Sequence, residues 1–215
     1  MILAETTLIV AVLLVMSGAV RGITRKLGAN DYTAAFLVLL ILLLNLRGNI
    51  KASERFTLSL AAVFSLFVGL FTLATNAEKG KAIPKALFST LGSSAIVFAY
   101  SLCFLGRVKL DPNLVALLLS LLLGLACALF AGRNYSICLF SALWGAFGGS
   151  TLHLIFFLKS GNIGGNYTFS VMWIGAISGL LLCHLFDRFF ATTKSPRPYV
   201  YYEADRMKDE KGSKR

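Results

Sequence analysis

Hydrophobic residues form seven long runs that fill almost the whole chain, and short polar segments separate them. A membrane-spanning helix needs roughly 17–25 mainly apolar residues, and six of the runs reach that length. The second run is shorter and needs residue 31 and residues 47–50 at its ends in order to span. The pattern predicts an all-α fold, a polytopic transmembrane helix bundle of about seven spans. The runs are residues 2–20, 32–46, 56–75, 86–105, 114–131, 136–158 and 171–190.

The predicted bundle occupies residues 1–190 and leaves a basic C-terminal segment, residues 191–215. That segment is too polar to form a core, so we expect a disordered tail. We find no internal repeat, and seven helices do not divide into two equal halves.

Composition agrees with the pattern of runs. The chain is 57% hydrophobic and 14% charged, and its mean hydropathy is +0.75. A soluble domain of 215 residues could not cover that much apolar surface. The formal net charge is +11, but the basic residues lie in short loops and in the tail, where they orient helices and meet lipid headgroups. The sequence therefore predicts membrane lipids, and no nucleic acid, as partners.

The distribution of Lys and Arg predicts the orientation. If the N-terminus lies outside, most of the basic residues fall on the inner side, many of them in the tail. Basic loops are retained in the cytoplasm. We therefore expect a bacterial cytoplasmic membrane protein with its N-terminus outside and its C-terminus in the cytoplasm.

Small residues recur at a spacing of four in several runs, as at Gly145 and Gly149 and at Gly175 and Gly179. Such residues lie on one side of a helix and let two backbones approach closely. We expect the last two runs to cross closely at these glycines. The four cysteines, all inside apolar runs without metal or redox spacing, are interpreted as small buried hydrophobic residues.

Ionisable and polar groups inside the runs are few, and His153, Ser150, His184 and Asp187 form the candidate polar site. Ser150 lies three residues before His153, which favours a local hydrogen bond. The predicted depths of the two histidines differ by roughly 13 Å, too far for one zinc ion. No metal, cofactor or catalytic residue is predicted.

The segment between the last two runs contains Gly161, Gly164 and Gly165. Glycine permits backbone conformations that break a helix. We expect a flexible connection, and the alternative is a loop whose backbone N–H groups bind an anion.

Two stretches carry a resemblance to a known family. One comprises residues 152–154, the glycine-rich segment 161–166 and the small-residue stretch 173–182. The other comprises residues 25–28 and 48–50. Together they resemble a family of uncharacterised multi-pass bacterial membrane proteins, a domain of unknown function.

The resemblance implies a multi-pass membrane fold and no particular activity, because that family has no established function. Its members usually have an acidic residue shortly before the histidine and an aspartate after the loop. In this chain Ser150 and Ser170 stand near those positions.

Three classes of function remain open. The leading hypothesis is a structural, accessory or partner-binding membrane protein, which includes a homo-oligomer. The alternative is a transporter or channel for a small or lipid-like solute, built around the last two runs, and an intramembrane enzyme comes third. A polar cavity open to one side would favour transport, and an exposed groove on a packed interior would favour a partner.

Overall fold

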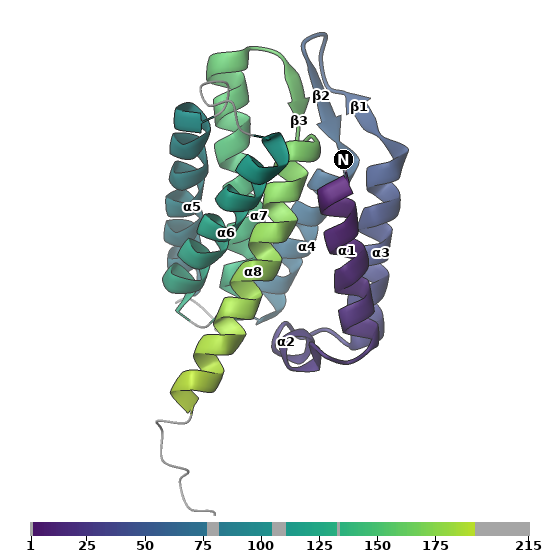
Figure 1. Ribbon diagram of the computed structural model, residues 1–215, viewed down its shortest axis with the longest axis vertical. Coiled ribbons are helices and arrows are strands. Elements are labelled where there is room, and N and C mark those ends of the chain that lie inside the picture. Colours follow the sequence, from purple (N-terminus) through teal and green to yellow (C-terminus); the bar gives the residue numbers. More distant parts are fainter. Residues whose placement is uncertain (1, 77–81, 105–110, 133, 192–215) are drawn as a thin grey trace, which may run out of the picture. The chain divides into compact units, whose positions relative to one another are not determined.

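The computed structural model describes residues 2–76, 82–104, 111–132 and 134–191, and most of them are helical (Figure 1). By contacts the chain divides into two units, Met1–His184 and Leu185–Arg215, of which the second begins inside the last helix. The predicted tail lies outside the described residues. The elements are α1 (Ile2–Met16), α2 (Arg21–Lys26), α3 (Asp31–Arg47), β1 (Asn49–Lys51), β2 (Phe56–Ser59), α4 (Leu60–Asn76), α5 (Ala82–Phe104), α6 (Pro112–Ala131), α7 (Tyr135–His153), the π-helical turn η1 (Leu154–Leu158), β3 (Gly161–Ile163) and α8 (Asn166–Ala191).

Each of the seven hydrophobic runs contains one long helix, so the all-α fold class is confirmed. Four segments are long and apolar enough to cross a membrane: Ala82–Phe104, Pro112–Ala131, Tyr135–Leu158 and Asn166–Phe189. The helices α1, α3 and α4 have 15, 17 and 17 residues, respectively. A membrane protein with transmembrane helices is therefore supported, and the number of seven spans stays a prediction.

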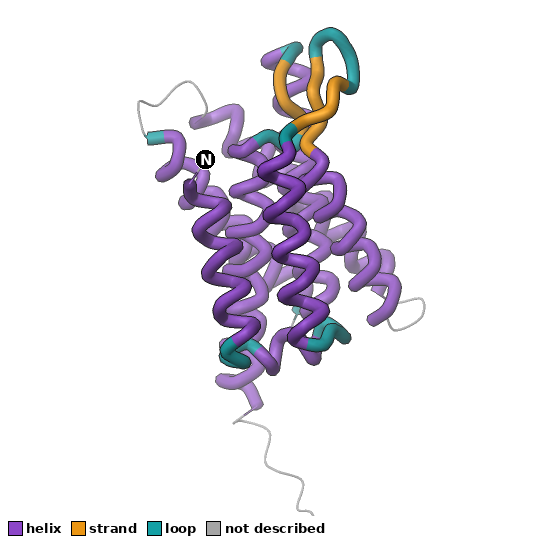
Figure 2. Tube along the Cα trace, turned by 90° about the vertical axis from the view of Figure 1, so that its right-hand side faces the viewer, coloured by secondary structure: helices purple, strands orange, loops and turns teal. Residues whose placement is uncertain are grey.

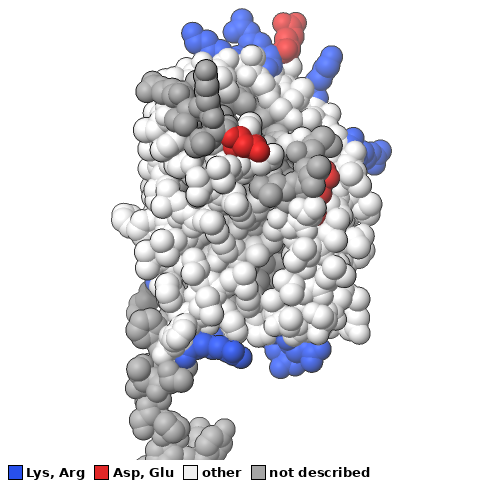
Figure 3. Space-filling view, in the orientation of Figure 1, with Lys and Arg blue, Asp and Glu red and all other residues white. Residues whose placement is uncertain are grey.

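Helix α7 is the centre of the bundle. It packs against α4, α5 and α6, and α3 packs against α1 and α4. Most side chains of α7 are buried, whereas large hydrophobic side chains such as Phe36, Phe71 and Phe88 are exposed on the other helices. Figure 3 shows this outer surface as a broad zone without charge, with basic side chains gathered at its two ends. This arrangement is that of a protein surrounded by lipid.

Glycines on α7 allow its close contact with α5. A Cβ atom added at Gly149 would lie 2.8 Å from Cβ of Val97, and one added at Gly145 would collide with Cβ of Ser93. The two helices therefore approach closely where these glycines face α5. The prediction that they face the last helix is wrong, because spacing shows which residues share a side but not which helix that side meets.

Glycines on α8 allow contact with α6 instead. A Cβ atom at Gly175 would lie 2.9 Å from Cδ2 of Leu123, and one at Gly179 would lie 3.1 Å from the carbonyl oxygen of Gly124. Gly179 also lies against Cys138 of α7, so α7 and α8 do touch at one place. Small residues thus mark close helix contacts as predicted, with partners that the sequence did not identify.

A three-stranded sheet lies at one end of the helices (Figure 2). Strand β2 is central, antiparallel to β1 and parallel to β3, and Leu58 is paired with both Ile50 and Ile163. The predicted helical start at residues 56–59 and the predicted flexible segment around Gly161 are therefore both strands. The backbone N–H and C=O groups of β2 and β3 bond to each other, and neither short segment could satisfy these groups alone.

The tripeptide Gly-Asn-Ile occurs twice, at residues 48–50, which lead into β1, and at residues 161–163, which form β3. In each case a related tetrapeptide follows shortly, FTLS at 56–59 and YTFS at 167–170. Matches this short do not make an internal repeat, so the prediction that the chain has none is unchanged.

Candidate functional site

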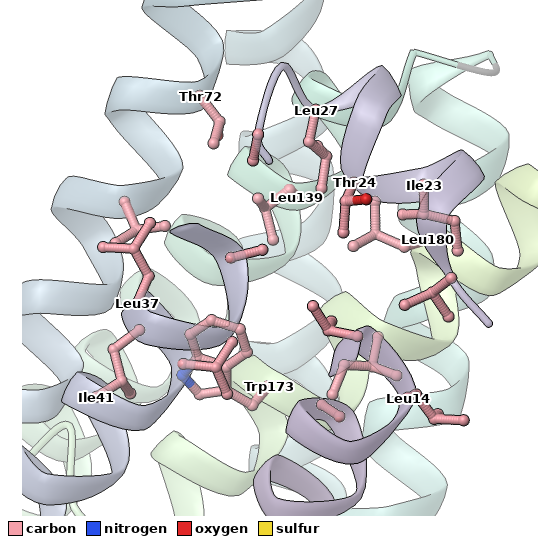
Figure 4. Close-up of a pocket in the computed structure, with 18 of the residues that line it drawn as sticks. Leu14, Ile23, Thr24, Leu27, Leu37, Ile41, Thr72, Leu139, Trp173 and Leu180 are labelled. Carbon is pink, nitrogen blue, oxygen red and sulfur yellow. The ribbon is translucent and has the colours of Figure 1, made fainter. Parts of the chain in front are cut away.

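A cavity of about 160 Å³ lies between the first three helices and helices α4, α7 and α8 (Figure 4). It is partly open and lies wholly within the first unit of the chain. The sequence does not predict it, because its wall combines residues from helices distant in sequence. The lining residues are Ala11, Leu14, Val15, Val20, Ile23, Thr24, Leu27, Ala29, Ala34, Leu37, Val38, Ile41, Val68, Thr72, Leu139, Trp173, Ile177, Leu180 and Leu181.

The cavity wall is apolar. Its two hydroxyl-bearing residues use their oxygens locally: Thr24 hydrogen-bonds to Asp31, and Thr72 donates to the carbonyl oxygen of Gly69 over 2.9 Å. An apolar cavity of roughly 150 Å³ in another protein stays dry and binds small hydrophobic molecules. The cavity described here is of that size, so its chemistry suits a hydrocarbon group rather than a polar solute.

Trp173 forms part of the cavity wall in a fixed orientation. Its indole Nε1–H donates a hydrogen bond to Oγ of Ser65 over 3.0 Å, and that hydroxyl donates in turn to the carbonyl oxygen of Ala61 over 2.7 Å. The indole nitrogen is thereby satisfied, and the rest of the ring presents an apolar surface. Trp173 joins α8 to α4 at the cavity.

The short helix α2 covers one end of the cavity. Gly18 and Gly28 stand on either side of it with φ angles of +74° and +72°, a conformation that favours glycine. The turn at Gly18 follows the end of α1 at Met16, four residues before the first hydrophobic run ends. The residues of α2 then contact α3 and α7 instead of continuing the first helix.

A polar clamp holds α2 to the start of α3. The Thr24 hydroxyl donates to one Asp31 carboxylate oxygen over 2.5 Å, and Nε of Arg21 donates to the other over 2.9 Å. These hydrogen bonds, that of Thr24 foremost, lower the pKa of the Asp31 carboxyl below its ordinary value. The sequence pattern does not predict this clamp, although Asp31 directly before an apolar run is a visible signal.

The predicted site residue His184 lies at this same end of the bundle. Its Nδ1 is 3.5 Å from the hydroxyl of Tyr135, the first residue of α7, and Gly22 of α2 lies against its ring. Nζ of Lys26 is 3.4 Å from the same hydroxyl and lies 4.7 Å from the ring centre of Tyr135. His184 therefore belongs to a polar contact among α2, α7 and α8.

His153 lies at the opposite end of α7, buried and stacked on Phe157 at 5.6 Å between ring centres. Since His184 is level with Tyr135, the two histidines are separated along α7 by 18 residues, roughly 27 Å. The predicted difference of roughly 13 Å is too small. Helix α8 begins at Asn166, five residues before the last hydrophobic run, which moves His184 deeper.

Several buried polar atoms near His153 lack a hydrogen-bond partner among the described residues. They include Oγ of Ser150, so its predicted bond to His153 is not formed. Ser101 lies one turn beyond Val97 on α5, and Tyr167 is the second residue of α8, so both are at the sheet end. The unpartnered atoms at this end belong to Ser150, Thr151 and Asn162, whereas the hydroxyls of Ser101 and Tyr167 interact with each other.

The remaining predicted site residue, Asp187, lies in α8 within the second unit. Asp187 interacts with another group, so it is not an unpaired carboxylate. Cys127, Cys138 and Cys183 are buried on three different helices, as expected for small hydrophobic residues, but Cys103 is exposed, so that interpretation is wrong for Cys103. Within the described residues, no group of three or more His, Cys, Asp or Glu side chains is arranged to hold a metal ion.

Comparison with protein-family models finds no match, and comparisons with curated proteins and with solved structures give no match either. The resemblance to uncharacterised bacterial membrane proteins therefore stays a prediction. The cavity and the polar groups at the two ends of the bundle are the features that bear on function.

Proposed function

We propose that this chain is a multi-pass membrane protein of the accessory or partner-binding kind, whose partner is a lipid or lipid-like molecule. The observation that carries the proposal is the apolar cavity of about 160 Å³, with hydrocarbon side chains on all sides. In a membrane, the acyl chains of lipids are the most abundant groups whose apolar surface matches such a wall.

The size of the cavity supports the insertion of only part of a lipid molecule. A volume near 150 Å³ accommodates a group about as large as benzene, so a whole phospholipid would not fit. One segment of an acyl chain would fill the cavity while the rest of the molecule leaves through the open side. The proposal therefore concerns a bound lipid in contact with the bilayer.

The proposed topology retains seven spans, with the N-terminus outside and the C-terminus in the cytoplasm of a bacterium. Two contacts support alternating directions. Strand β2, which precedes α4, pairs with β3, which follows α7, whereas Lys26 after α1 meets Tyr135 at the start of α7. Each contact joins segments separated by four helices, as an alternating bundle requires.

Fluorescence of Trp173 tests the cavity directly. The chain contains two tryptophans, so Trp144→Phe leaves Trp173 as the reporter. We expect phospholipids with brominated acyl chains to quench its emission in vesicles. Ala34→Phe, which fills the cavity, should reduce the quenching, since Ala34 forms part of the wall.

Thr33→Phe is the matched control, because it adds the same ring at the exposed neighbouring residue outside the cavity. It should leave the quenching unchanged. Equal quenching in the wild-type, A34F and T33F proteins would contradict lipid entry into the cavity. Native mass spectrometry of the same proteins provides an independent count of retained lipid.

A second candidate function is passage of a small polar solute at the sheet end of α5, α7 and α8. The specific observation is the group of unpartnered buried hydroxyl and amide groups near His153. Buried polar groups are normally hydrogen-bonded to protein, water or ligand. A water-filled path would supply the partners that the described side chains do not.

Cysteine accessibility tests this candidate. In a Cys103→Ser background, which removes the exposed native thiol, Ser101→Cys should react with a small cationic thiol reagent if water reaches this region. Ser141→Cys is the control, because Ser141 is also buried but lies in the middle of α7. Equal rates at both positions would remove the support for a polar path.

A further inference from the structure

We propose that an acyl chain enters the cavity laterally from the bilayer, between Leu14 of α1 and Leu181 of α8, and that it belongs to a lipid in the leaflet at the α2 end of the bundle. This inference rests on the proposed function and adds the entrance of the cavity and the source of the lipid. It follows from the exposure of the wall residues and from their positions along the helices.

The cavity opens between α1 and α8. The structure describes all nineteen residues of the cavity wall, and all but two of them are buried or half-buried. The two exceptions are Leu14, which is 38% exposed, and Leu181, which is 41% exposed. A side chain that lines the cavity and is also exposed lies where the cavity meets the surface. Leu14 and Leu181 therefore mark the mouth of the cavity, with one side formed by α1 and the other by α8.

The mouth opens into hydrocarbon. The surface next to it on α1 includes Val10 and Leu13, which are 52% and 63% exposed and do not line the cavity. Lipid tails are as apolar as these side chains, which they contact in a bilayer. An acyl chain that passes between Leu14 and Leu181 stays in apolar surroundings, whereas a polar solute would lose its hydrogen bonds to water. The entrance therefore suits an apolar chain.

The mouth lies near the α2 end of the bundle. Leu14 is two residues before the end of α1 at Met16, and Leu181 is three residues before His184, whose ring lies against Gly22 of α2. At 1.5 Å per residue, both leucines are within about 5 Å of this end. The polar clamp of α2 lies at the same end, and charged side chains at helix ends are typical of the headgroup level. The mouth is therefore just below the headgroups of one leaflet.

The cavity extends from the mouth toward the middle of the bundle (Figure 4). Trp173 is eight residues before Leu181 on α8, about 12 Å along the helix axis, and Ile41 is ten residues after the start of α3, about 15 Å. One leaflet contributes half of the hydrocarbon core, about 15 Å. A lipid of the leaflet at the α2 end can therefore place one chain in the cavity while its headgroup stays at its usual level. A lipid of the opposite leaflet would have to reach past Trp173 to meet the mouth.

The experiment closes the mouth reversibly and measures Trp173 fluorescence. In a Cys103→Ser, Trp144→Phe background, Leu14→Cys and Leu181→Cys are each modified in detergent with a bulky apolar thiosulfonate reagent, and intact mass confirms one adduct per chain. The proteins are then placed in vesicles of brominated phosphatidylcholine. We expect each adduct to reduce the quenching several-fold. Reduction of the disulfide that holds the adduct should restore the quenching, which distinguishes closure of the mouth from misfolding.

Leu13→Cys is the matched control, because Leu13 is the exposed neighbour of Leu14 and does not line the cavity. Its adduct should leave the quenching unchanged. Full quenching in the L14C and L181C adducts would overturn the inference, as would an equal loss in the L13C adduct. Absence of quenching in the unmodified proteins would instead refute the proposed function itself.

The source of the lipid is tested with brominated phosphatidylcholine in the outer leaflet of the vesicles only. In the same background, an impermeant thiol reagent on Asn30→Cys, at the α2 end, gives the fraction of molecules whose α2 end faces outward. We expect the quenched fraction of Trp173 emission to match this fraction. A quenched fraction that matches the remaining molecules would place the source in the opposite leaflet and overturn the inference.

Discussion

The Thr24 hydroxyl and the Asp31 carboxylate form a hydrogen bond of 2.5 Å that fixes the turn between α2 and α3. Arg21 completes the clamp through a 2.9 Å ion pair with the second carboxylate oxygen. The clamp holds the cavity-lining residues of α2 in place, because Thr24 itself forms part of the cavity wall. A short helix between two glycine turns thus acquires a defined position.

The first prediction is that stability falls at acidic pH through Asp31. Its pKa is lowered by the Thr24 hydrogen bond and by Arg21, so the ionised carboxylate stabilises the fold above the ordinary value of 3.8. That stabilisation is lost as the pH falls through the lowered pKa. Thermal unfolding in detergent between about pH 6 and pH 3 should show a smaller acid-induced decrease in Tm for Asp31→Asn than for the wild type.

At neutral pH the same D31N variant should unfold a few degrees below the wild type, because the charge-assisted bonds are weakened. Glu54→Gln provides the control, since Glu54 is exposed and forms no ion pair among the described residues. An acid-induced decrease that is identical in D31N and the wild type would show that Asp31 does not contribute.

The second prediction concerns the contact of α6 with α8. A Cβ atom at Gly124 would lie 2.9 Å from the carbonyl oxygen of Gly175 and from the backbone nitrogen of Gly179. Backbone cannot move as easily as a side chain, so Gly124→Ala should destabilise the protein by about 1–3 kcal/mol. Chemical unfolding in mixed micelles would measure the change.

Gly69→Ala on α4 is the matched control. Its nearest neighbour would be Cδ1 of Leu143 at 3.2 Å, the end of a side chain that can rotate away. Alanine also favours the helix over glycine by about 1 kcal/mol, so G69A should be close to neutral. Equal losses in G124A and G69A would argue against close backbone packing at Gly124.

The third prediction distinguishes the two possible partners of α7. Gly145→Ala should destabilise the protein by about 1–3 kcal/mol, because the new methyl group meets Cβ of Ser93 on α5. Adding Ser93→Gly removes that Cβ and should restore part of the stability, despite the unfavourable effect of glycine in a helix. If G145A were rescued by changes on α8 and not by S93G, the arrangement of α5 and α7 would be wrong.

The runs of hydrophobic residues predicted the helical fold because a helix in lipid satisfies all its backbone groups within one segment. They did not predict the sheet, because β2 and β3 pair across about 100 residues of sequence and each is too short to show a period of its own. The runs also overestimated the length of the first helix. The residues just after Met16 are mostly apolar, but the chain turns at Gly18 and the helix has already ended.

The candidate polar residues were identified by type, but their surroundings depended on tertiary structure. His184 was expected to differ in depth from His153 by roughly 13 Å, and it lies instead at the opposite end of the bundle, where it meets Tyr135 and α2. The cavity was unpredictable for a related reason. Leu, Val and Ile side chains that face a neighbouring helix, a cavity or lipid have the same pattern in the sequence, and only the packing distinguishes them.

The fourth prediction is the orientation of the bundle. In a Cys103→Ser background, Ala52→Cys in the turn between β1 and β2 should react with a membrane-impermeant thiol reagent added to intact cells. Asn30→Cys before α3 should react only after the cells are opened. Both residues are exposed and lie near opposite ends of α3, so each is a control for the other. The reverse result would place the N-terminus in the cytoplasm.

The last prediction concerns the two histidines. Their separation of roughly 27 Å along α7 prevents them from sharing a metal ion, whose bonds to nitrogen are about 2 Å long. We therefore expect elemental analysis of the purified protein to find no stoichiometric zinc or cobalt. His153→Ala and His184→Ala should not change its metal content.

The two histidines should also have separate effects. His184→Ala should lower thermal stability, because the His184 ring lies against Tyr135 and Gly22. His153→Ala should alter the reactivity of Ser101→Cys at the sheet end and leave the quenching of Trp173 by brominated lipid unchanged, since His153 does not line the cavity. Loss of lipid quenching in H153A would mean that the two ends of the bundle are coupled, contrary to their separation in the structure.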